Sequence, residues 1–131
     1  MSELVSVSSL LYAARELVRE EARAKSLRVI IVGVDEQVIV NRGHVVLVIA
    51  SLLRDAIDTV QPGGRVAVTG QELDRELVFA VYDSGTPSAP ASRFDEFAAE
   101  AAHAIGGRVW TAHPLDGNLS LFSLPLAHAD N

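Results

Sequence analysis

Residues 44–60, "HVVLVIASLLRDAIDTV", are the feature of this chain that most restricts its fold. The first half of this stretch is apolar on almost every side. A helix with such a composition is stable only when it lies inside the core of a protein. The segment "QPGG" that follows combines proline and glycine, so it ends the helix. The rest of the chain must therefore supply a layer that covers a buried central helix.

The segments on either side of this helix predict β-strands. Residues 27–33, "LRVIIVG", read as a strand that is buried on both faces, and residues 38–43, "VIVNRG", read as its hairpin partner. After the helix come "RVAVTG" at 65–70 and "ELVFAVYD" at 76–83, with the polar connection "QELDR" between them. The sequence therefore predicts one hairpin before the central helix and a second one after it.

Two further helices are expected, one near each end of the chain. After a short strand at 3–7, Ser8 or Ser9 can cap a helix that is apolar on one side and charged on the other. Residues 93–105, "RFDEFAAEAAHAI", form the last helix, which stops at Gly106 and Gly107. Strands at 108–112 and 118–126 follow it. The apolar positions of the first helix are Leu10, Leu11, Ala14, Leu17 and Val18.

The order of these elements predicts an α+β fold: a two-layer sandwich with three helices on one face of a mixed, mostly antiparallel sheet. The chain has 131 residues, of which 49% are hydrophobic, enough for one core. We therefore expect residues 1–131 to form a single domain.

Charge and composition exclude several classes of partner. The net charge is −6, with 17 acidic residues against 11 basic ones, which argues against binding to nucleic acid or to an anionic membrane. Cysteine is absent, so the chain has no disulfide, no thiolate metal site and no cysteine nucleophile. We expect a cytoplasmic protein.

Three segments, taken in order, resemble the GHKL superfamily, the ATP-binding domain of histidine kinases, DNA gyrase, the large heat-shock chaperones and mismatch-repair ATPases. They are "SLLRDAIDTVQPGGRVAV" at 51–68, "VYDSGTP" at 81–87, and "GGRVW" followed by "NLSLFSLPL". The resemblance is to the histidine kinase catalytic domain and implies its ATPase fold. It also implies that Asp55 stands where the family has the asparagine that holds magnesium, and that Asp83 and Gly85 match the box that binds adenine.

The same alignment shows departures from an ATP-binding site. Leu47 and Ser51 stand where an active kinase has an acidic or amide residue and an asparagine, and Pro87 replaces a glycine. The lid is shortened to residues 87–92, "PSAPAS". The glycine-rich segment that exposes backbone amides to phosphate falls on residues 92–95, "SRFD", which instead resembles a helix cap. The residues that grip the phosphates are therefore expected to be lost.

These features favour a non-catalytic pseudokinase module that acts by protein–protein interaction in bacterial two-component signalling or regulation. ATP and magnesium binding are expected to be lost or weak, so that Asp55, Asp83 and Gly85 form only a vestigial nucleotide pocket. The expected partner is a response regulator, a kinase or another signalling protein, and homodimerisation remains open. The expected contact residues are Arg15, Arg19, Arg23, Phe94 and Phe97.

Two alternative functions are compatible with the sequence. One is a genuine ATP-binding kinase or anti-sigma-type domain that uses Asp55 and Asp83 with an unusual lid. The other is a phosphotransfer adaptor that docks response regulators and carries a phosphoacceptor histidine, for which His44 and His103 are weak candidates. Purely structural roles are also open: Asp83 can be a turn residue, and Asp55 can belong to the solvated edge of a buried helix.

Overall fold

The computed structural model describes residues 1–33, 35–85, 96–112, 114 and 116–126. The first half contains a strand, two short helices, two strands and the long central helix. The second half contains four strands and one helix. In chain order the elements are β1 (Glu3–Ser6), α1 (Val7–Leu17), α2 (Arg19–Ala24), β2 (Arg28–Gly33), β3 (Gln37–Val40), α3 (Arg42–Thr59), β4 (Arg65–Leu73), β5 (Glu76–Asp83), α4 (Glu96–Ala104), β6 (Arg108–Ala112) and β7 (Asn118–Pro125).

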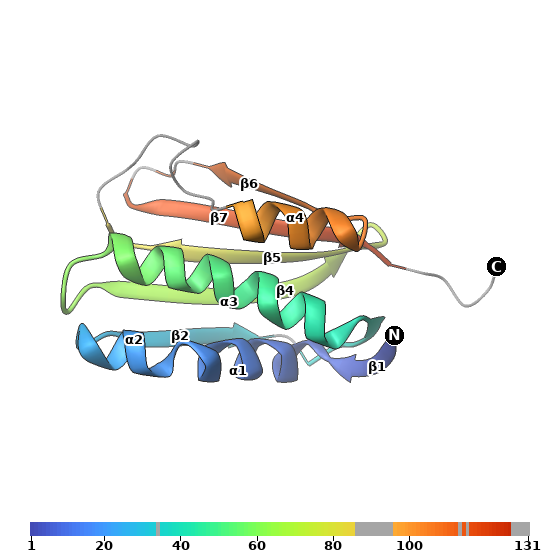
Figure 1. The fold of residues 1–131 in the computed structure, drawn as a ribbon, viewed down its shortest axis with the longest axis horizontal. Helices are drawn as coiled ribbons and strands as arrows, with labels where there is room; N and C mark the ends of the chain where they lie inside the picture. The colour runs from blue at the N-terminus through green and yellow to red at the C-terminus, as the bar shows by residue number, and fades with distance from the viewer. Residues whose placement is uncertain (34, 86–95, 113, 115, 127–131) are drawn as a thin grey trace.

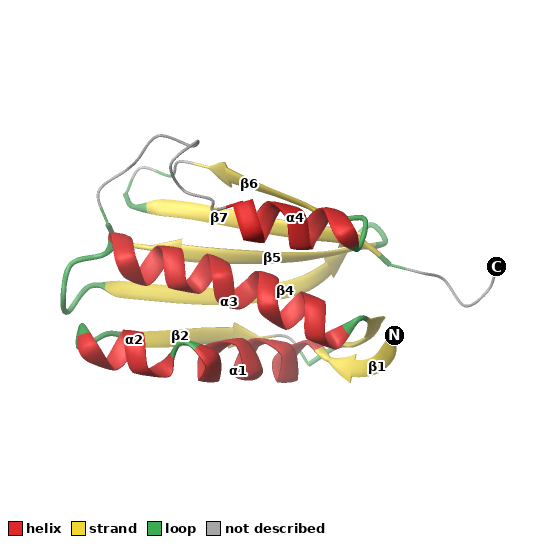
Figure 2. Ribbon diagram, viewed as in Figure 1, coloured by secondary structure: helices red, strands yellow, loops and turns green. Residues whose placement is uncertain are grey.

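The main sheet has five strands in the order β2-β4-β5-β7-β6. The pair β2–β4 is parallel, and the other three pairs are antiparallel. The helices α1, α3 and α4 lie side by side on one face of this sheet, and α2 continues from α1 (Figures 1 and 2). This arrangement confirms the predicted two-layer α+β sandwich with a mixed, mostly antiparallel sheet.

The central helix α3 is the middle of the core, as its composition predicted. Most of its residues between Val45 and Ile57 are buried, and it packs between α1 and α4 over the sheet (Figure 1). Its first turn is capped by Asn41, whose side-chain oxygen accepts a hydrogen bond from the amide of His44. Below it, Phe79 of β5 and Phe122 of β7 stack with ring centroids 5.7 Å apart.

The hairpin predicted between the second and third strands is wrong. β2 pairs in parallel with β4, whereas β3 pairs antiparallel with β1 in a separate two-stranded sheet. The predicted burial of β2 on both faces is also wrong. Val29 is buried, but Ile30 and Val32 lie on the other face, which no described helix covers, and their side chains are 45% and 59% exposed.

The hairpin predicted between β4 and β5 is confirmed. Their register runs from Val66 opposite Asp83 to Leu73 opposite Glu76. The turn residues Asp74 and Arg75 both have positive φ, 49° and 66°, as two-residue turns between twisted strands require.

The start of the first helix differs from the prediction. Ser6, and not Ser8 or Ser9, is the N-cap, because its hydroxyl oxygen accepts from the amide of Ser9 at 3.1 Å. The helix also stops at Val18, after which α2 begins at Arg19. None of the helices in the described ranges is both long and apolar enough to cross a lipid bilayer.

Candidate functional site

The helix α3 presents the residues of the expected nucleotide pocket at intervals of one turn. Leu47, Ser51 and Asp55 are four residues apart, so they follow one face of the helix. Leu47 is 46% exposed, Ser51 is buried, and Asp55 is partly buried. The exposed position on this face is therefore a hydrocarbon side chain, which has no atom that can bind metal or accept a proton.

Asp83 lies at the end of β5 and is fully buried. Its Oδ1 accepts two hydrogen bonds, from the backbone amide of Gly85 at 3.0 Å and from the side-chain amide of Asn118 at 2.9 Å. The bond to an amide two residues ahead is an Asx turn, the structural role that the sequence left open for this residue. Asn118 begins β7 opposite Asp83, so the pairing of β5 with β7 brings the two side chains together.

Gly85 lies close to the C-terminal end of α3. A Cβ atom at this position would meet Asp83 Oδ1 and Thr59 Cγ2, each at 3.0 Å, and the Thr59 carbonyl oxygen at 3.2 Å. The glycine therefore lets the strand end approach the helix closely. The structure thus places Asp83 and Gly85 next to the C-terminal end of α3.

The expected lid and phosphate segment, residues 86–95, lies outside the described residues, and so does the expected contact residue Phe94. Phe97, on α4, is 51% exposed. His44, in the first turn of α3, and His103, in the last turn of α4, are both exposed. Within the described ranges, acidic, histidine and cysteine side chains form no group of three that could hold a metal ion.

These observations do not fit a magnesium–nucleotide site of the kinase kind. Asp83 has no exposed surface, Ser51 is buried and short, and Leu47 offers no polar atom. A metal ion needs several oxygen ligands, of which this helix face supplies the Asp55 carboxylate.

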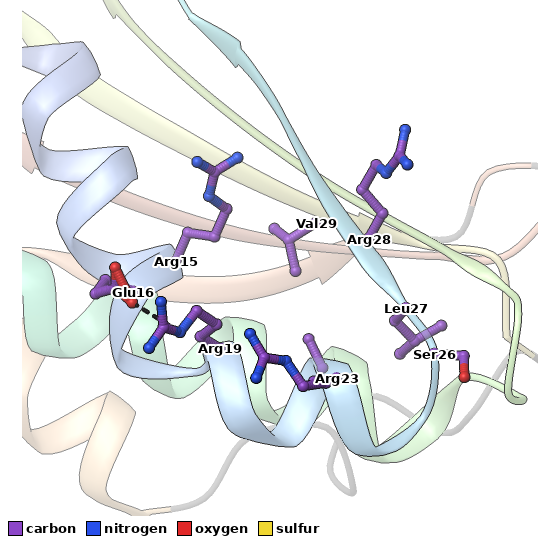
Figure 3. Close-up of a pocket in the computed structure, with 9 residues that line it drawn as sticks. Arg15, Glu16, Arg19, Arg23, Ser26, Leu27, Arg28 and Val29 are labelled. Atoms are coloured by element: carbon purple, nitrogen blue, oxygen red, sulfur yellow. Dashed lines mark ion pairs between the residues drawn. The ribbon is translucent and has the colours of Figure 1, made fainter.

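The three arginines expected at an interaction surface line one open cavity of about 600 Å³ between α1, α2 and β2. Figure 3 shows Arg15, Arg19 and Arg23 arranged along α1 and α2, with Leu27 and Val29 of the following segment opposite them. Arg28, at the start of β2, also lines the cavity and was not anticipated from the sequence. Arg28 reaches the cavity because β2 is the end strand of the main sheet and lies beside α1 and α2.

The charges around this cavity are unevenly balanced. Arg19 pairs with Glu16 at 3.1 Å, and Arg15 lies over the ring of Tyr12 at 4.8 Å from its centroid. In the part of the chain that the structure describes, neither Arg23 nor Arg28 forms an ion pair. Four arginines thus contribute to the lining of a cavity whose one carboxylate is that of Glu16, in a protein of net charge −6.

No protein-family model and no curated protein sequence matches the chain. Solved structures of histidine kinases do match its fold. The nucleotide-free catalytic domain of histidine kinase ThkA has a TM-score of 0.82 at 19% identity, covering 96% of this chain and 97% of that one. The mycobacterial sensor histidine kinase MprB has a TM-score of 0.74 at 20% identity, with 96% and 98% covered.

A third match is ThkA in complex with the response regulator protein TrrA, with a TM-score of 0.78 at 18% identity. It covers 96% of this chain but 42% of that one, so the chain corresponds to part of that kinase. The chain therefore has the fold of a histidine kinase catalytic domain, as its three motifs predicted.

Proposed function

We propose that this protein is a signalling module with a histidine kinase catalytic fold, in which nucleotide binding is lost or weak and which binds an acidic protein partner. The observation that carries the proposal is the cavity lined by Arg15, Arg19, Arg23 and Arg28. Arginine is well suited to such a surface, because its planar guanidinium group binds carboxylates and phosphates through two parallel hydrogen bonds.

The cavity lies near the helix end that adjoins the vestigial pocket. It is formed by α1, α2 and β2, and Lys25, which follows α2, donates to carbonyl oxygens at the C-terminal end of α3, where Gly85 also contacts the helix. A partner bound at the arginines would therefore lie close to the vestigial pocket. The ThkA–TrrA complex supports a response regulator as one candidate partner.

Loss of nucleotide binding is supported by the residues that face the vestigial pocket. In the kinases, binding of magnesium and the nucleotide phosphates depends on ligands on the central helix and on backbone amides at the start of the last helix. This chain has Leu47 and Ser51 on the helix and "SRFD" at residues 92–95. The hydrogen bonds from Gly85 and Asn118 to Asp83 give that aspartate a role in the folded structure itself.

Isothermal titration with magnesium and ATP tests the first half of the proposal. We expect no binding, or binding weaker than about 10 μM, which corresponds to roughly −7 kcal/mol. Tighter binding would favour the alternative of a genuine ATP-binding domain.

Comparative affinity capture tests the second half. A variant with Arg15→Glu, Arg19→Glu and Arg23→Glu should lose an acidic partner that the wild type retains. A control variant with Arg42→Glu and Arg75→Glu, outside the cavity, should retain it. Circular dichroism checks that both variants fold. Recovery of the same proteins by all three forms would show that the cavity is not the docking surface.

A further inference from the structure

The strand β2 lies at one end of the main sheet. It pairs with β4 on one side, and in the described part of the chain no strand pairs with its other side. The strand that follows it, β3, pairs with β1 in a separate sheet. A strand at the edge of a sheet presents a row of backbone N–H and C=O groups that can pair with a further strand. We call this side of β2 the free edge.

The arginine cavity adjoins the free edge. One wall of the cavity is the segment that leads into β2, with Leu27 and Val29, and the other wall is formed by α1 and α2 (Figure 3). Among the described residues that line the cavity, none belongs to β4, the strand on the opposite side of β2. The cavity therefore lies on the side of the free edge, and a strand added there would run alongside α1 and α2.

The spacing of the arginines matches that of side chains on an added strand. Arg15, Arg19 and Arg23 are four residues apart along α1 and α2, and a helix rises about 1.5 Å per residue, so they recur about every 6 Å. Side chains on one face of an extended strand are two residues apart, which is about 6.6 Å. The two helices and β2 run along nearly the same axis in Figure 1. Alternate side chains of an added strand could therefore meet the arginines one to one.

The free edge is long enough for this match. From Arg15 to Arg23 the helices rise about 12 Å, whereas the six residues of β2 span about 20 Å. The arginines are also accessible to a ligand. The side chains of Arg19 and Glu16, which form an ion pair, are 60% and 62% exposed, and an exposed pair of this kind contributes little. A carboxylate of a ligand can therefore replace Glu16.

We propose that the free edge of β2 binds an extended acidic segment of a partner protein as an added strand, with carboxylates at alternate positions directed at Arg15, Arg19 and Arg23. Backbone hydrogen bonds to β2 supply affinity, and the arginines select an acidic residue at every second position. This binding mode rests on the proposed function, an acidic partner at the arginine cavity. It adds the conformation and the sequence pattern of the bound segment.

Fluorescence anisotropy with two labelled synthetic peptides tests the pattern. The probe is an eight-residue peptide in which glutamate and threonine alternate. Its matched control has four glutamates followed by four threonines, with the same composition and charge. We expect the probe to bind about fivefold more tightly, because successive side chains of a strand point to opposite faces and the control leaves one arginine without a carboxylate. Equal binding of the two peptides would overturn the proposal.

Arginine variants test whether the cavity is the site of binding. A cavity variant that combines Arg15→Gln, Arg19→Gln and Arg23→Gln should bind the alternating peptide at least about tenfold more weakly. Its matched control removes three arginines outside the cavity, with the substitutions Arg42→Gln, Arg75→Gln and Arg108→Gln. This control has the same net charge and should bind like the wild type. Equal weakening in both variants would mean that net charge alone attracts the peptide, which would overturn the proposal.

Amide hydrogen exchange measured by NMR distinguishes an added strand from an acidic helix lying on the arginines. With saturating alternating peptide, the β2 amides that face away from β4 should exchange about tenfold more slowly or less, because they become hydrogen-bonded. A helical ligand leaves these amides exposed to solvent. Unchanged exchange of the β2 amides in the complex would therefore rule out strand addition.

The capture experiment described above separates this binding mode from the proposed function. If capture of a partner depends on the cavity arginines but the alternating peptide does not bind, the extended mode is wrong and the proposed function stands. If neither capture nor peptide binding depends on these arginines, both are wrong.

Discussion

A substitution of Asp55 can distinguish two proposed causes of weak nucleotide binding. One is the loss of a single magnesium ligand, and the other is the loss of the whole nucleotide site. By the sequence resemblance Asp55 stands where the family has its magnesium-binding asparagine, and it is partly buried on α3. An aspartate can itself bind magnesium through oxygen, so this replacement alone does not remove the metal. The neighbouring positions, Leu47 and Ser51, are the ones that lack suitable ligands.

We predict that Asp55→Asn does not restore binding of magnesium and ATP. The charge of the nucleotide lies mostly on its phosphates, and one amide side chain cannot replace the several contacts that a triphosphate needs. Isothermal titration of the variant beside the wild type measures this. Binding gained by the variant with a dissociation constant below about 10 μM would mean that the remaining site suffices.

Lys25 connects the end of one helix to the end of another. It is the only lysine in the chain, and its Nζ donates to the backbone carbonyl oxygens of Ile57, Asp58 and Val60 at 2.8, 3.1 and 2.9 Å. These carbonyls lie at the C-terminal end of α3, where the helix dipole is negative and backbone acceptors lack helical partners. The cation therefore caps the central helix.

We predict that Lys25→Met lowers the free energy of unfolding by about 1.5–3 kcal/mol, the range for hydrogen bonds to a charged group. Methionine keeps the length of the apolar stem but removes the charge and the donors. Urea denaturation followed by circular dichroism measures the change. Arg23→Met, two residues earlier on α2, is the control and should have an effect within about 0.5 kcal/mol. Equal effects of the two substitutions would contradict the capping role.

The helices α2 and α3 are also joined by an ion pair. Arg54 Nε donates to Glu21 Oε2 at 2.8 Å, and this hydrogen bond is the main cause that lowers the pKa of Glu21 below its usual 4.5. A group whose pKa is lowered on folding stabilises the folded state above its unfolded pKa. That contribution disappears as pH falls through the folded pKa.

We predict that Glu21→Gln destabilises the protein by less than about 1 kcal/mol at pH 7, because the pair is solvent-exposed and screened. The difference from the wild type should vanish as the pH falls below the usual range of the Glu21 pKa. Denaturation at pH 7 and at acidic pH measures it. Glu20→Gln, whose side chain is 75% exposed, should match the wild type at both values. A difference that grows with acidity would contradict the assignment.

At the scale of the whole molecule, a ligand that binds the folded state raises its stability by mass action. If nucleotide binding is weak or absent, ATP should therefore add little to the stability of the folded protein, whichever residues cause the loss. The histidine kinase fold would retain its stability without ATP, because its core is filled by side chains from α3 and the sheet.

We predict that about 1 mM magnesium–ATP changes the stability by less than about 0.4 kcal/mol, the value for a dissociation constant of about 1 mM. A constant of about 10 μM would give about 2.7 kcal/mol and a rise of several degrees in the melting temperature. Thermal denaturation followed by circular dichroism distinguishes these outcomes. Magnesium with sulfate serves as the control for ionic strength.

The sequence alone determined the elements whose signals are local. The apolar composition of residues 44–60 predicted the buried helix α3, and two apolar strand patterns joined by the polar connection "QELDR" predicted the β4–β5 hairpin. The three motifs predicted the histidine kinase fold. Helix periodicity, strand alternation and turn residues depend on neighbours in the chain, so they can be read without knowing distant contacts.

The tertiary structure alone decided which strands pair and which side chains meet. β2 and β3 are adjacent in sequence and could form a hairpin, but β2 pairs with β4 and β3 pairs with β1. That order places Arg28 beside the helix arginines and leaves Ile30 and Val32 exposed. Likewise, the hydrogen bonds of Asn118 to Asp83 and of Lys25 to α3 join residues more than thirty positions apart. Such contacts form only when the core packs, because the energy that selects them comes from burial shared across the chain.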